Sequence, residues 1–280
     1  MFVDNKIRDE VTVLLEEVSR KNIMPFYKNL LAEQIYTKSS PTDFVTIADK
    51  ECEEFLTKKL MQLIIGSKVI GEEASSENGV SFSSFKDDII WTVDPIDGTK
   101  NFVNGNEQFC SMVALLQDGK PKASWIYIPI LDICYFASIK GVEVAYYGTE
   151  YNILDVKDKK TTSTNVNFLK YCASLRYLEP DIKVVIKDKV KRLKNQVFVG
   201  SAGIEAIMLA KGQIDFMFYS MTTPWDHAPV DMFCRAVGGK AGQISFHKRA
   251  SNDIKLEKST PVLFVRSIAD WELVNDFISI

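Results

Sequence analysis

The sequence has no long hydrophobic run and few cysteines. No apolar stretch approaches the roughly 18 residues that a membrane-spanning helix needs. The five cysteines are an odd number, and no two of them form a Cys-x-x-Cys pair. This pattern argues against a zinc site or a disulfide framework and favours a reducing compartment. The N-terminal residues lack the basic-then-apolar order of a signal peptide, so we expect a cytoplasmic protein.

The chain also lacks an excess of charge of either sign. Its 34 basic and 37 acidic residues leave a formal net charge of −3, which provides no electrostatic basis for binding nucleic acid or an acidic membrane. Lysines cluster in 183–194, but apolar residues interrupt them, as on the solvated face of an amphipathic helix. With 46% hydrophobic residues in 280, the chain can bury a large core. We expect neither nucleic acid nor membrane among its partners.

Apolar spacing predicts helices at the start of the chain. Apolar residues recur at helical spacing from Ile7 to Val18, and Pro25 is expected to kink that helix or split it. A second helix is predicted from Thr46 or Asp49 to Leu63. The strand-rich part that follows is predicted at 112–116, 123–128 and 133–139, with a hairpin-type loop at 117–121.

The second half of the chain alternates between expected strands and helices. Residues 161–167 are polar and predict a surface loop or a junction. Strands are predicted at 169–175, 197–199 and 214–219, and a helix is predicted at 201–211, which Gly212 ends. There is no internal repeat and no low-complexity segment.

The most informative segment is 94–99, Asp-Pro-Ile-Asp-Gly-Thr, which follows the apolar run 89–93. Asp94 and Asp97 lie at the mouth of an expected strand, and Gly98 permits a tight turn whose free amides can point at an anion. Carboxylates beside free amides suit a divalent cation that holds a phosphate, because Mg²⁺ prefers oxygen ligands and keeps several waters. An ordinary acidic turn at the end of a strand is the alternative.

Two further acidic segments also follow apolar runs. Glu72 and Glu73 come after a glycine, and such a pair on a surface turn is usually only solvated. Asp226 lies between a tryptophan and the apolar segment 228–237, where a plain helix N-cap is the alternative. A capping aspartate can still offer its other oxygen to a metal, so the two interpretations are compatible.

Together these segments resemble the inositol monophosphatase family of metal-dependent, lithium-sensitive phosphomonoesterases. The resemblance spans nearly the whole chain and includes the segments Lys38 to Asp43, Thr46 to Asp49, Gly71 to Glu73, Asp94 to Phe102, Trp225-Asp226 and Gly238-Gly239. It implies an α+β fold, a layered α-β-α-β-α sandwich of the sugar-phosphatase type, in a single domain over residues 1–280. The metal-site half would cover about 1–150 and the second half about 151–280. It also implies a homodimer.

The resemblance further implies two Mg²⁺ ions, with a third, weaker ion near Glu72. Asp94 would bridge the first two ions. Glu72 and the backbone carbonyl of Ile96 would complete one site, and Asp97 and Asp226 would complete the other. Metal ions suit phosphate-ester hydrolysis because they neutralise the phosphate, acidify a bound water and stabilise the departing oxygen.

Thr99 and Asp49 occupy the family positions that orient the attacking water, and Glu72 is expected to act catalytically as a ligand of the ion that carries this water. A hydroxyl can accept a hydrogen bond from water while it donates its own hydrogen to a carboxylate. Helix capping by Asp49 and packing by Thr99 are the structural alternatives. The amides of Gly98 and Thr99 are expected to hold phosphate oxygens. No phosphoenzyme is expected.

The substrate is less determined than the chemistry. Inositol-specific members place a glutamate at the position of Tyr219, whose bulkier, uncharged side chain favours a flatter or more apolar partner. With Lys100 inside the segment from Asp94 to Phe102, the chain resembles family members that act on phosphorylated nucleotides or histidinol phosphate. Ser201 and Ala202, at the start of their helix, are further expected substrate contacts. His227, beside Asp226, is interpreted as a residue that packs or that supports the site indirectly, and not as a general acid.

The sequence therefore predicts a Mg²⁺-dependent phosphomonoesterase for a small phosphorylated metabolite, either an inositol monophosphate-like polyol or a sugar phosphate. The alternative activity is a 3′(2′),5′-bisphosphate nucleotidase or a histidinol-phosphatase of the same family. The alternative of another class is a non-catalytic regulatory binding protein on the same fold. The full set of candidate ligands favours the enzyme, because a pure binding protein has no need of them.

Overall fold

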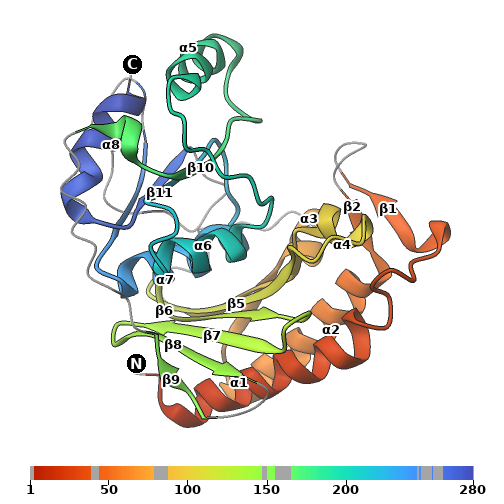
Figure 1. The fold of residues 1–280 in the computed structure, drawn as a ribbon. Helices are drawn as coiled ribbons and strands as arrows, with labels where there is room; N and C mark the ends of the chain where they lie inside the picture. The colour runs from red at the N-terminus through yellow and green to blue at the C-terminus, as the bar shows by residue number, and fades with distance from the viewer. Residues whose placement is uncertain are drawn as a thin grey trace.

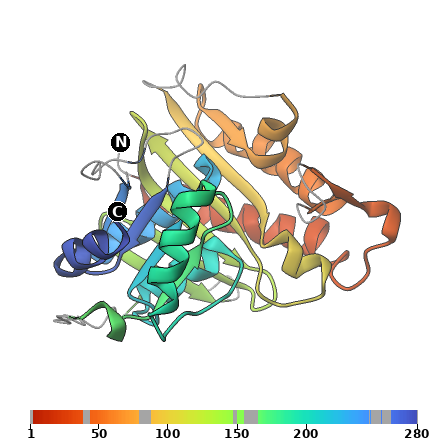
Figure 2. The same ribbon diagram turned by 90° about the horizontal axis from the view of Figure 1, so that it is seen from above.

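The computed structural model describes residues 3–38, 44–78, 88–146, 150–154, 165–244, 246, 254 and 261–279. Most of the segment from Lys38 to Asp43 and most of the predicted loop at 161–167 lie outside the described residues. Within these ranges, the two larger of three β-sheets alternate with layers of helices (Figure 1). Figure 2 gives the view from above, with α8 (blue) at one side of the molecule and α2 (orange) at the other.

The outer layer beneath the larger sheet consists of α1 and α2. α1 (Asn5–Val18) begins at Asp4, whose carboxylate accepts a hydrogen bond from the Ile7 N–H, and it buries the predicted apolar stripe. A π-helical turn, Ser19–Ile23, continues it. The expectation that Pro25 kinks or splits this helix is wrong, because the helix ends before it. Pro25 has no N–H to continue the ladder, and the chain goes on in tighter turns, such as Phe26 N to Ile23 O at 3.1 Å.

α2 (Ile47–Leu63) confirms the helix predicted from Thr46 or Asp49 to Leu63 and decides for the earlier start. Thr46 is its N-cap, and its backbone N–H bonds the carboxylate of Asp49, the third residue of the helix, in a capping box. Leu56 and Leu60 are fully buried against the sheet and α1. These two side chains attach the helix to the core beneath the larger sheet.

The larger sheet has seven strands in the order β3-β4-β5-β6-β7-β8-β9. Its first pair is parallel and every other pair is antiparallel. The strands are β3 (Lys68–Gly71), β4 (Ile89–Asp97), β5 (Cys110–Gln117), β6 (Lys120–Ile128), β7 (Ile133–Ser138), β8 (Gly141–Tyr146) and β9 (Asn152–Ile153). The predicted hairpin loop is confirmed: Asp118 and Gly119 have φ of 55° and 67°, as a tight two-residue turn requires.

The smaller sheet has four strands in the order β10-β11-β13-β12, and its β10–β11 pair is parallel. These strands are β10 (Tyr171–Ser174), β11 (Phe216–Tyr219), β12 (Lys240–Gln243) and β13 (Val262–Val265). α6 (Ala202–Ala210) and α7 (Pro224–Ala236) lie between the two sheets, and their apolar side chains join both sheets into one core. α5 (Pro180–Lys191) and α8 (Trp271–Ile278) pack on the far face. The layered α+β fold is thus confirmed.

Shorter elements connect these layers. A two-stranded sheet of β1 (Ile35–Thr37) and β2 (Phe44–Thr46) precedes α2. α3 (Glu72–Asn78) follows β3, and α4 (Thr99–Val103) follows β4. 3₁₀ turns occur at Ala32–Gln34, Val166–Phe168 and Ile268–Asp270. No helix in the described ranges has the length and apolar character needed to cross a membrane.

The strand predicted at 197–199 is wrong. The chain meets β10 at an isolated bridge between Gln196 and Tyr171, which consists of the bonds Tyr171 N to Asn195 O at 3.2 Å and Val197 N to Tyr171 O at 2.8 Å. The carbonyl of Val199 then bonds Asn101 instead of a neighbouring strand, and Gly200 turns the chain at φ 77°. The segment therefore leaves the sheet and leads into α6.

We predict that Leu56→Ala lowers the free energy of unfolding by about 2–5 kcal/mol, because it leaves a cavity between α2 and the larger sheet. The matched control is Ile65→Ala, since Ile65 is 95% exposed and its removal is expected to change stability by less than about 0.5 kcal/mol. Urea unfolding of both variants measures the difference. Equal effects would contradict the described packing.

Candidate functional site

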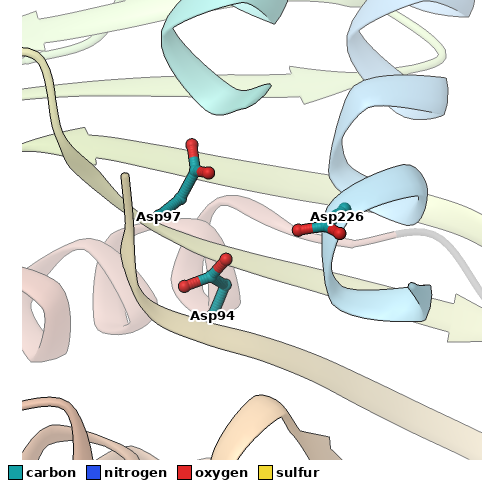
Figure 3. A group of neighbouring side chains, drawn as sticks. All are labelled: Asp94, Asp97 and Asp226. Atoms are coloured by element: carbon teal, nitrogen blue, oxygen red, sulfur yellow. The ribbon is translucent and has the colours of Figure 1, made fainter. Parts of the chain in front are cut away.

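Three aspartates from two distant parts of the chain converge at one point. Asp94 and Asp97 belong to β4 and Asp226 to α7, and one carboxylate oxygen from each lies within 4.8 Å of the others. Figure 3 shows the three side chains gathered between β4 and the start of α7. Asp94 and Asp97 are buried, at 3% and 9% exposure.

A β-bulge at the end of β4 brings Asp94 and Asp97 together. In regular pairing, residues three apart point to opposite faces of a sheet. Here Asp94 pairs with Met112 and Asp97 pairs with Cys110. Between these two pairs β4 contains one residue more than β5. The extra residue turns both carboxylates to the same side. Pro95, which has no N–H for the ladder, stabilises the irregularity by accepting a 2.7 Å hydrogen bond from Ser111 Oγ at its carbonyl.

A capping box positions Asp226. The N-cap of α7 is Thr223, and Asp226 is the third residue of the helix. The interpretation of Asp226 as the N-cap itself is therefore wrong: the helix begins earlier than predicted because Pro224 is favourable in its first turn. Asp226 Oδ2 accepts from Thr223 N and Thr223 Oγ1 at 3.2 and 2.7 Å. These bonds hold the carboxylate rigidly at the start of the helix.

Asp49 is held by the same device at the start of α2. Its Oδ2 accepts from Thr46 N at 2.7 Å and from Thr46 Oγ1 at 2.6 Å, while its Oδ1 lies 3.5 Å from Thr99 Oγ1. The Thr99 hydroxyl is 2.9 Å from the Ile96 carbonyl oxygen. A hydroxyl has one hydrogen to donate, and the shorter distance places it on Ile96. Asp49 thus contributes to a helix cap and also approaches Thr99.

The start of α6 points at Asp97. Asp97 Oδ2 accepts from Ser201 Oγ at 2.6 Å, from Gly203 N at 2.8 Å and from Cys110 Sγ at 3.5 Å. A Cβ on Gly203 would lie 2.5 Å from Cys110 Sγ, so the close approach of α6 to β5 requires glycine. Sequence reasoning placed Ser201 and Ala202 near a substrate. Ser201 is buried, with its hydroxyl on Asp97, and Ala202 is half-buried.

Gly98 forms the turn between β4 and α4. Its φ of 87° lies in the left-handed region, and a Cβ would lie 2.9 Å from the Gln108 carbonyl oxygen. Only glycine fits without strain, as expected from the sequence. Gly98 and Thr99 are half-buried at the start of α4, where the first amides of a helix have no intrahelical acceptor.

Glu72 lies outside the group of three aspartates. Its carboxylate and that of Glu73 both accept from Lys38 Nζ at 2.7 Å. Glu53 supports this arrangement from α2, since it accepts from the Glu73 and Ala74 N–H groups at 2.7 and 2.8 Å. Sequence reasoning missed Glu53. The available signal was its spacing of four residues from Asp49, which places both acids on one face of a helix.

The electrostatics of the group are those of crowded, buried anions. Burial raises the pKa of Asp94 well above its usual value, and the nearby carboxylates of Glu72, Asp97 and Asp226 raise it further. Burial, followed by the charges of Asp97 and Glu72, raises the pKa of Asp226 to about 7. The pKa of Asp49 is raised to about 7, mainly by burial.

Asp94 Oδ1 is a buried oxygen without a hydrogen-bond partner. A buried polar atom in this state is costly unless something satisfies it. A hard divalent cation fits the position, because the group offers only carboxylate oxygens and a cation would compensate their mutual repulsion. The residues present therefore fit a Mg²⁺ ion.

Tyr219 lies in β11 at 9% exposure. Its hydroxyl donates to Glu205 Oε2, so the one hydrogen that the phenol can donate is already used within the protein. Sequence reasoning did not single out Glu205.

Comparisons with known proteins identify the family of this chain. The inositol monophosphatase family model matches residues 8–263. The inositol-1-monophosphatase of Bacillus subtilis is 29% identical over 209 residues, which are 73% of this chain and 74% of the relative. The inositol monophosphatase of Dictyostelium discoideum is 30% identical over 213 residues, 75% of each chain. The 3′(2′),5′-bisphosphate nucleotidase CysQ of Haemophilus influenzae is 28% identical over 225 residues, 79% of this chain and 78% of the relative.

A solved structure shares the fold. The crystal structure of an IMPase/NADP phosphatase complexed with Mg²⁺ and phosphate has a TM-score of 0.76 at 21% identity. The match covers 97% of this chain and 94% of that one. At this identity the likeness speaks for the fold alone. The family match over almost the whole chain, with curated relatives at 30% identity, leads to the conclusion that this chain belongs to the inositol monophosphatase family of phosphatases.

Proposed function

We propose that this chain is a Mg²⁺-dependent phosphomonoesterase that acts on a small phosphorylated metabolite, an inositol monophosphate-like polyol or a sugar phosphate. The observation that carries the proposal is the approach of the Asp94, Asp97 and Asp226 carboxylates to within 4.8 Å of one another. Asp94 Oδ1, buried and without a hydrogen-bond partner, is the atom most in need of a cation.

Asp94, Asp97 and Asp226 would hold the metal, and Glu72 and the Ile96 carbonyl would complete a set for two to three ions. When bound, Mg²⁺ would neutralise the charge on the phosphate ester, acidify water and stabilise the departing oxygen. Glu72 now pairs with Lys38, so its use as a ligand requires this ion pair to give way. The remaining chemistry belongs to the chain's own residues.

Thr99 and Asp49 are proposed to orient the attacking water. The Thr99 hydroxyl has both the Asp49 carboxylate and the Ile96 carbonyl within 3.5 Å, so its hydrogen has an acceptor on the protein side. Its lone pairs then accept a hydrogen bond from water. Asp49 is fixed by two bonds from Thr46 and cannot move with the hydroxyl. This pair would fix the direction of attack without a covalent intermediate.

The amides of Gly98 and Thr99 are proposed to hold phosphate oxygens at the start of α4. Ser201 and Ala202 are proposed to line the same position from the start of α6. Tyr219 would contribute through its ring, because its hydroxyl hydrogen is on Glu205. An aromatic ring in place of a carboxylate argues against an inositol ring as the substrate. A phosphorylated nucleotide or histidinol phosphate therefore remains among the candidate substrates.

Two observations bear on the alternative functions, a nucleotidase and a regulatory binding protein. One relative is described as a bisphosphate nucleotidase, which favours keeping a nucleotide among the candidate substrates. A regulatory binding protein on the same fold would not need three carboxylates at one point, two of them buried. We also propose a single-domain, cytoplasmic homodimer that is inhibited by lithium.

The first prediction about function is that the protein releases phosphate in Mg²⁺ and that chelation of the metal lowers the rate by at least ~10²-fold. The panel is myo-inositol 1-phosphate, fructose 1,6-bisphosphate, 3′-phosphoadenosine 5′-phosphate, histidinol phosphate and glycerol 2-phosphate. A strong preference for one compound identifies the substrate class. Release that is unchanged by chelation would refute the metal requirement, and no release from any compound would favour the binding protein.

The second prediction concerns Asp94→Asn. The variant should lose activity by ~10²–10³-fold, as Asp97→Asn should, because a ligand charge disappears. The metal-free Asp94→Asn protein should nevertheless be more stable than wild type, since one of three crowded anions is neutralised. Each kcal/mol corresponds to a rise in Tm of about 2–4 °C in a chain of this size.

The control for Asp94→Asn is Asp231→Asn, in the same helix as Asp226. Asp231 is buried at 4% exposure and its carboxylate bonds Arg235 at 2.6 Å, so its neutralisation should lower Tm and leave turnover intact. Calorimetry in a chelator, beside phosphate release in Mg²⁺, separates the two variants. A fall in Tm for Asp94→Asn would contradict the repulsion argument.

The third prediction is a pH dependence of the metal-free protein. The pKa values of Asp49 and Asp226 are raised to about 7 and that of Glu73 to about 8. The folded chain therefore binds more protons than the unfolded chain between about pH 4 and pH 8. The stability that these groups contribute is present at low pH and is lost as pH rises through that window.

Thermal unfolding in a chelator should show Tm falling from pH 5 to pH 8, and Mg²⁺ should weaken or reverse this trend. A metal-free protein that gains stability over this range would contradict the prediction.

A further inference from the structure

Glu205 in α6 is a buried acid outside the group of three aspartates. Its side chain is 5% exposed, and burial raises its pKa to about 7 although three hydrogen-bond donors around it act in the opposite direction. A carboxyl group is costly to bury unless its bonds serve the structure around it. Its partners therefore indicate its role.

The partners of Glu205 join a strand to a turn. Tyr219 in β11 donates its hydroxyl hydrogen to Glu205 Oε2. Gly200 donates its backbone N–H to Glu205 Oε1 at 3.3 Å, and the N–H of Val199 also bonds this carboxylate. Glu205 thus ties the turn before α6 to the smaller sheet.

The same turn is held from its other side by Asn101 of α4. Asn101 Nδ2 lies 3.0 Å from the Val199 carbonyl oxygen and 2.6 Å from that of Gln108. Gly200 has a φ of 77°, a conformation in which other residues would be strained. The turn at Val199 and Gly200 therefore donates its amide hydrogens to Glu205 and accepts a hydrogen bond from Asn101 at the Val199 carbonyl.

This turn leads directly to the groups that hold Asp97. Ser201 Oγ and Gly203 N donate to Asp97 Oδ2 at 2.6 and 2.8 Å. Both donors follow Gly200 within three residues, so a shift of the turn moves them relative to β4. Asp97 in turn belongs to the proposed metal site.

We propose that Glu205 and Tyr219 form a positioning pair that sets the orientation of the Asp97 carboxylate through the turn at Val199 and Gly200. In the described part of the chain, neither side chain hydrogen-bonds to Asp94, Asp97 or Asp226, so the pair is not catalytic. The charge of Asp97 also raises the pKa of Glu205 directly, and Tyr219→Phe, which keeps the Glu205 charge, isolates the effect of the turn. The inference rests on the proposed function, since it assigns the effect to metal binding.

The test compares Tyr219→Phe and Glu205→Gln with wild type. Tyr219→Phe removes only the hydroxyl. Glu205→Gln keeps the shape of the side chain, and its remaining carbonyl oxygen cannot serve the tyrosine and the turn together. Tyr171→Phe is the matched control, because the Tyr171 hydroxyl is also buried in the smaller sheet and donates to Val190 O at 3.2 Å, away from the turn.

The first readout is Mn²⁺ binding by titration calorimetry. Both variants should bind Mn²⁺ about 10-fold more weakly, the size of effect seen when a group that orients a ligand is removed. Tyr171→Phe should bind as wild type does. The double variant should be no weaker than the weaker single variant, because the two side chains act through one pathway. The second readout is hydrogen exchange of the metal-free protein, in which amides at 199–203 should lose protection in Glu205→Gln.

The outcomes separate this inference from the proposed function. Wild type that binds Mn²⁺ and releases phosphate, with both variants binding Mn²⁺ like Tyr171→Phe, would overturn the positioning pair alone. A loss of stability in the variants without weaker Mn²⁺ binding would overturn it as well, since that is a structural role only. Wild type that neither binds Mn²⁺ nor releases phosphate would overturn the proposed function and the inference together.

Discussion

Mutual repulsion among three crowded carboxylates, two buried and one half-buried, is the constraint on which the rest of this structure depends. Asp94, Asp97 and Asp226 approach within 4.8 Å. Burial raises the pKa of each, and neighbouring carboxylates raise the pKa of Asp94 and Asp226 further. Such a group separates unless the surrounding chain holds it rigidly. A β-bulge holds Asp94, the start of α6 holds Asp97, and a capping box holds Asp226. The layered fold supplies these three supports from both halves of the chain.

Hydrogen bonds at the starts of helices hold the acidic side chains around the site. Helix starts provide the fixed points: α2 holds Asp49, α6 holds Asp97 and α7 holds Asp226 through bonds at their first turns. Each acid thereby uses one oxygen for the protein. Glu53 and Glu205 extend the pattern outward, since each places a buried carboxylate on backbone amides next to a site residue. Rigidity at the site thus comes from hydrogen bonds to backbone that is itself fixed by sheet and helix.

Much of this was predictable from the sequence, for reasons that differ by residue. Asp94, Asp97 and Asp226 stand out because acids after apolar runs are conspicuous, and Thr46 with Asp49 forms a capping signature. The β-bulge was not predictable, because it depends on how β5 pairs with β4. The contact between Glu205 and Tyr219 joins residues 14 apart on different elements, and only the packed fold brings them together. The sequence of residues 197–199 is typical of a strand. The side chain of Asn101, distant in the sequence, bonds the Val199 carbonyl that a neighbouring strand would otherwise bond.

The central claim is that the three aspartates hold a divalent cation. The most direct measurement is anomalous diffraction from crystals of the wild-type protein grown with Mn²⁺. The account predicts an anomalous peak bounded by the carboxylates of Asp94, Asp97 and Asp226, with Asp94 Oδ1 among the ligands. Crystals that show no peak at this position, or only a peak elsewhere on the protein, would contradict it.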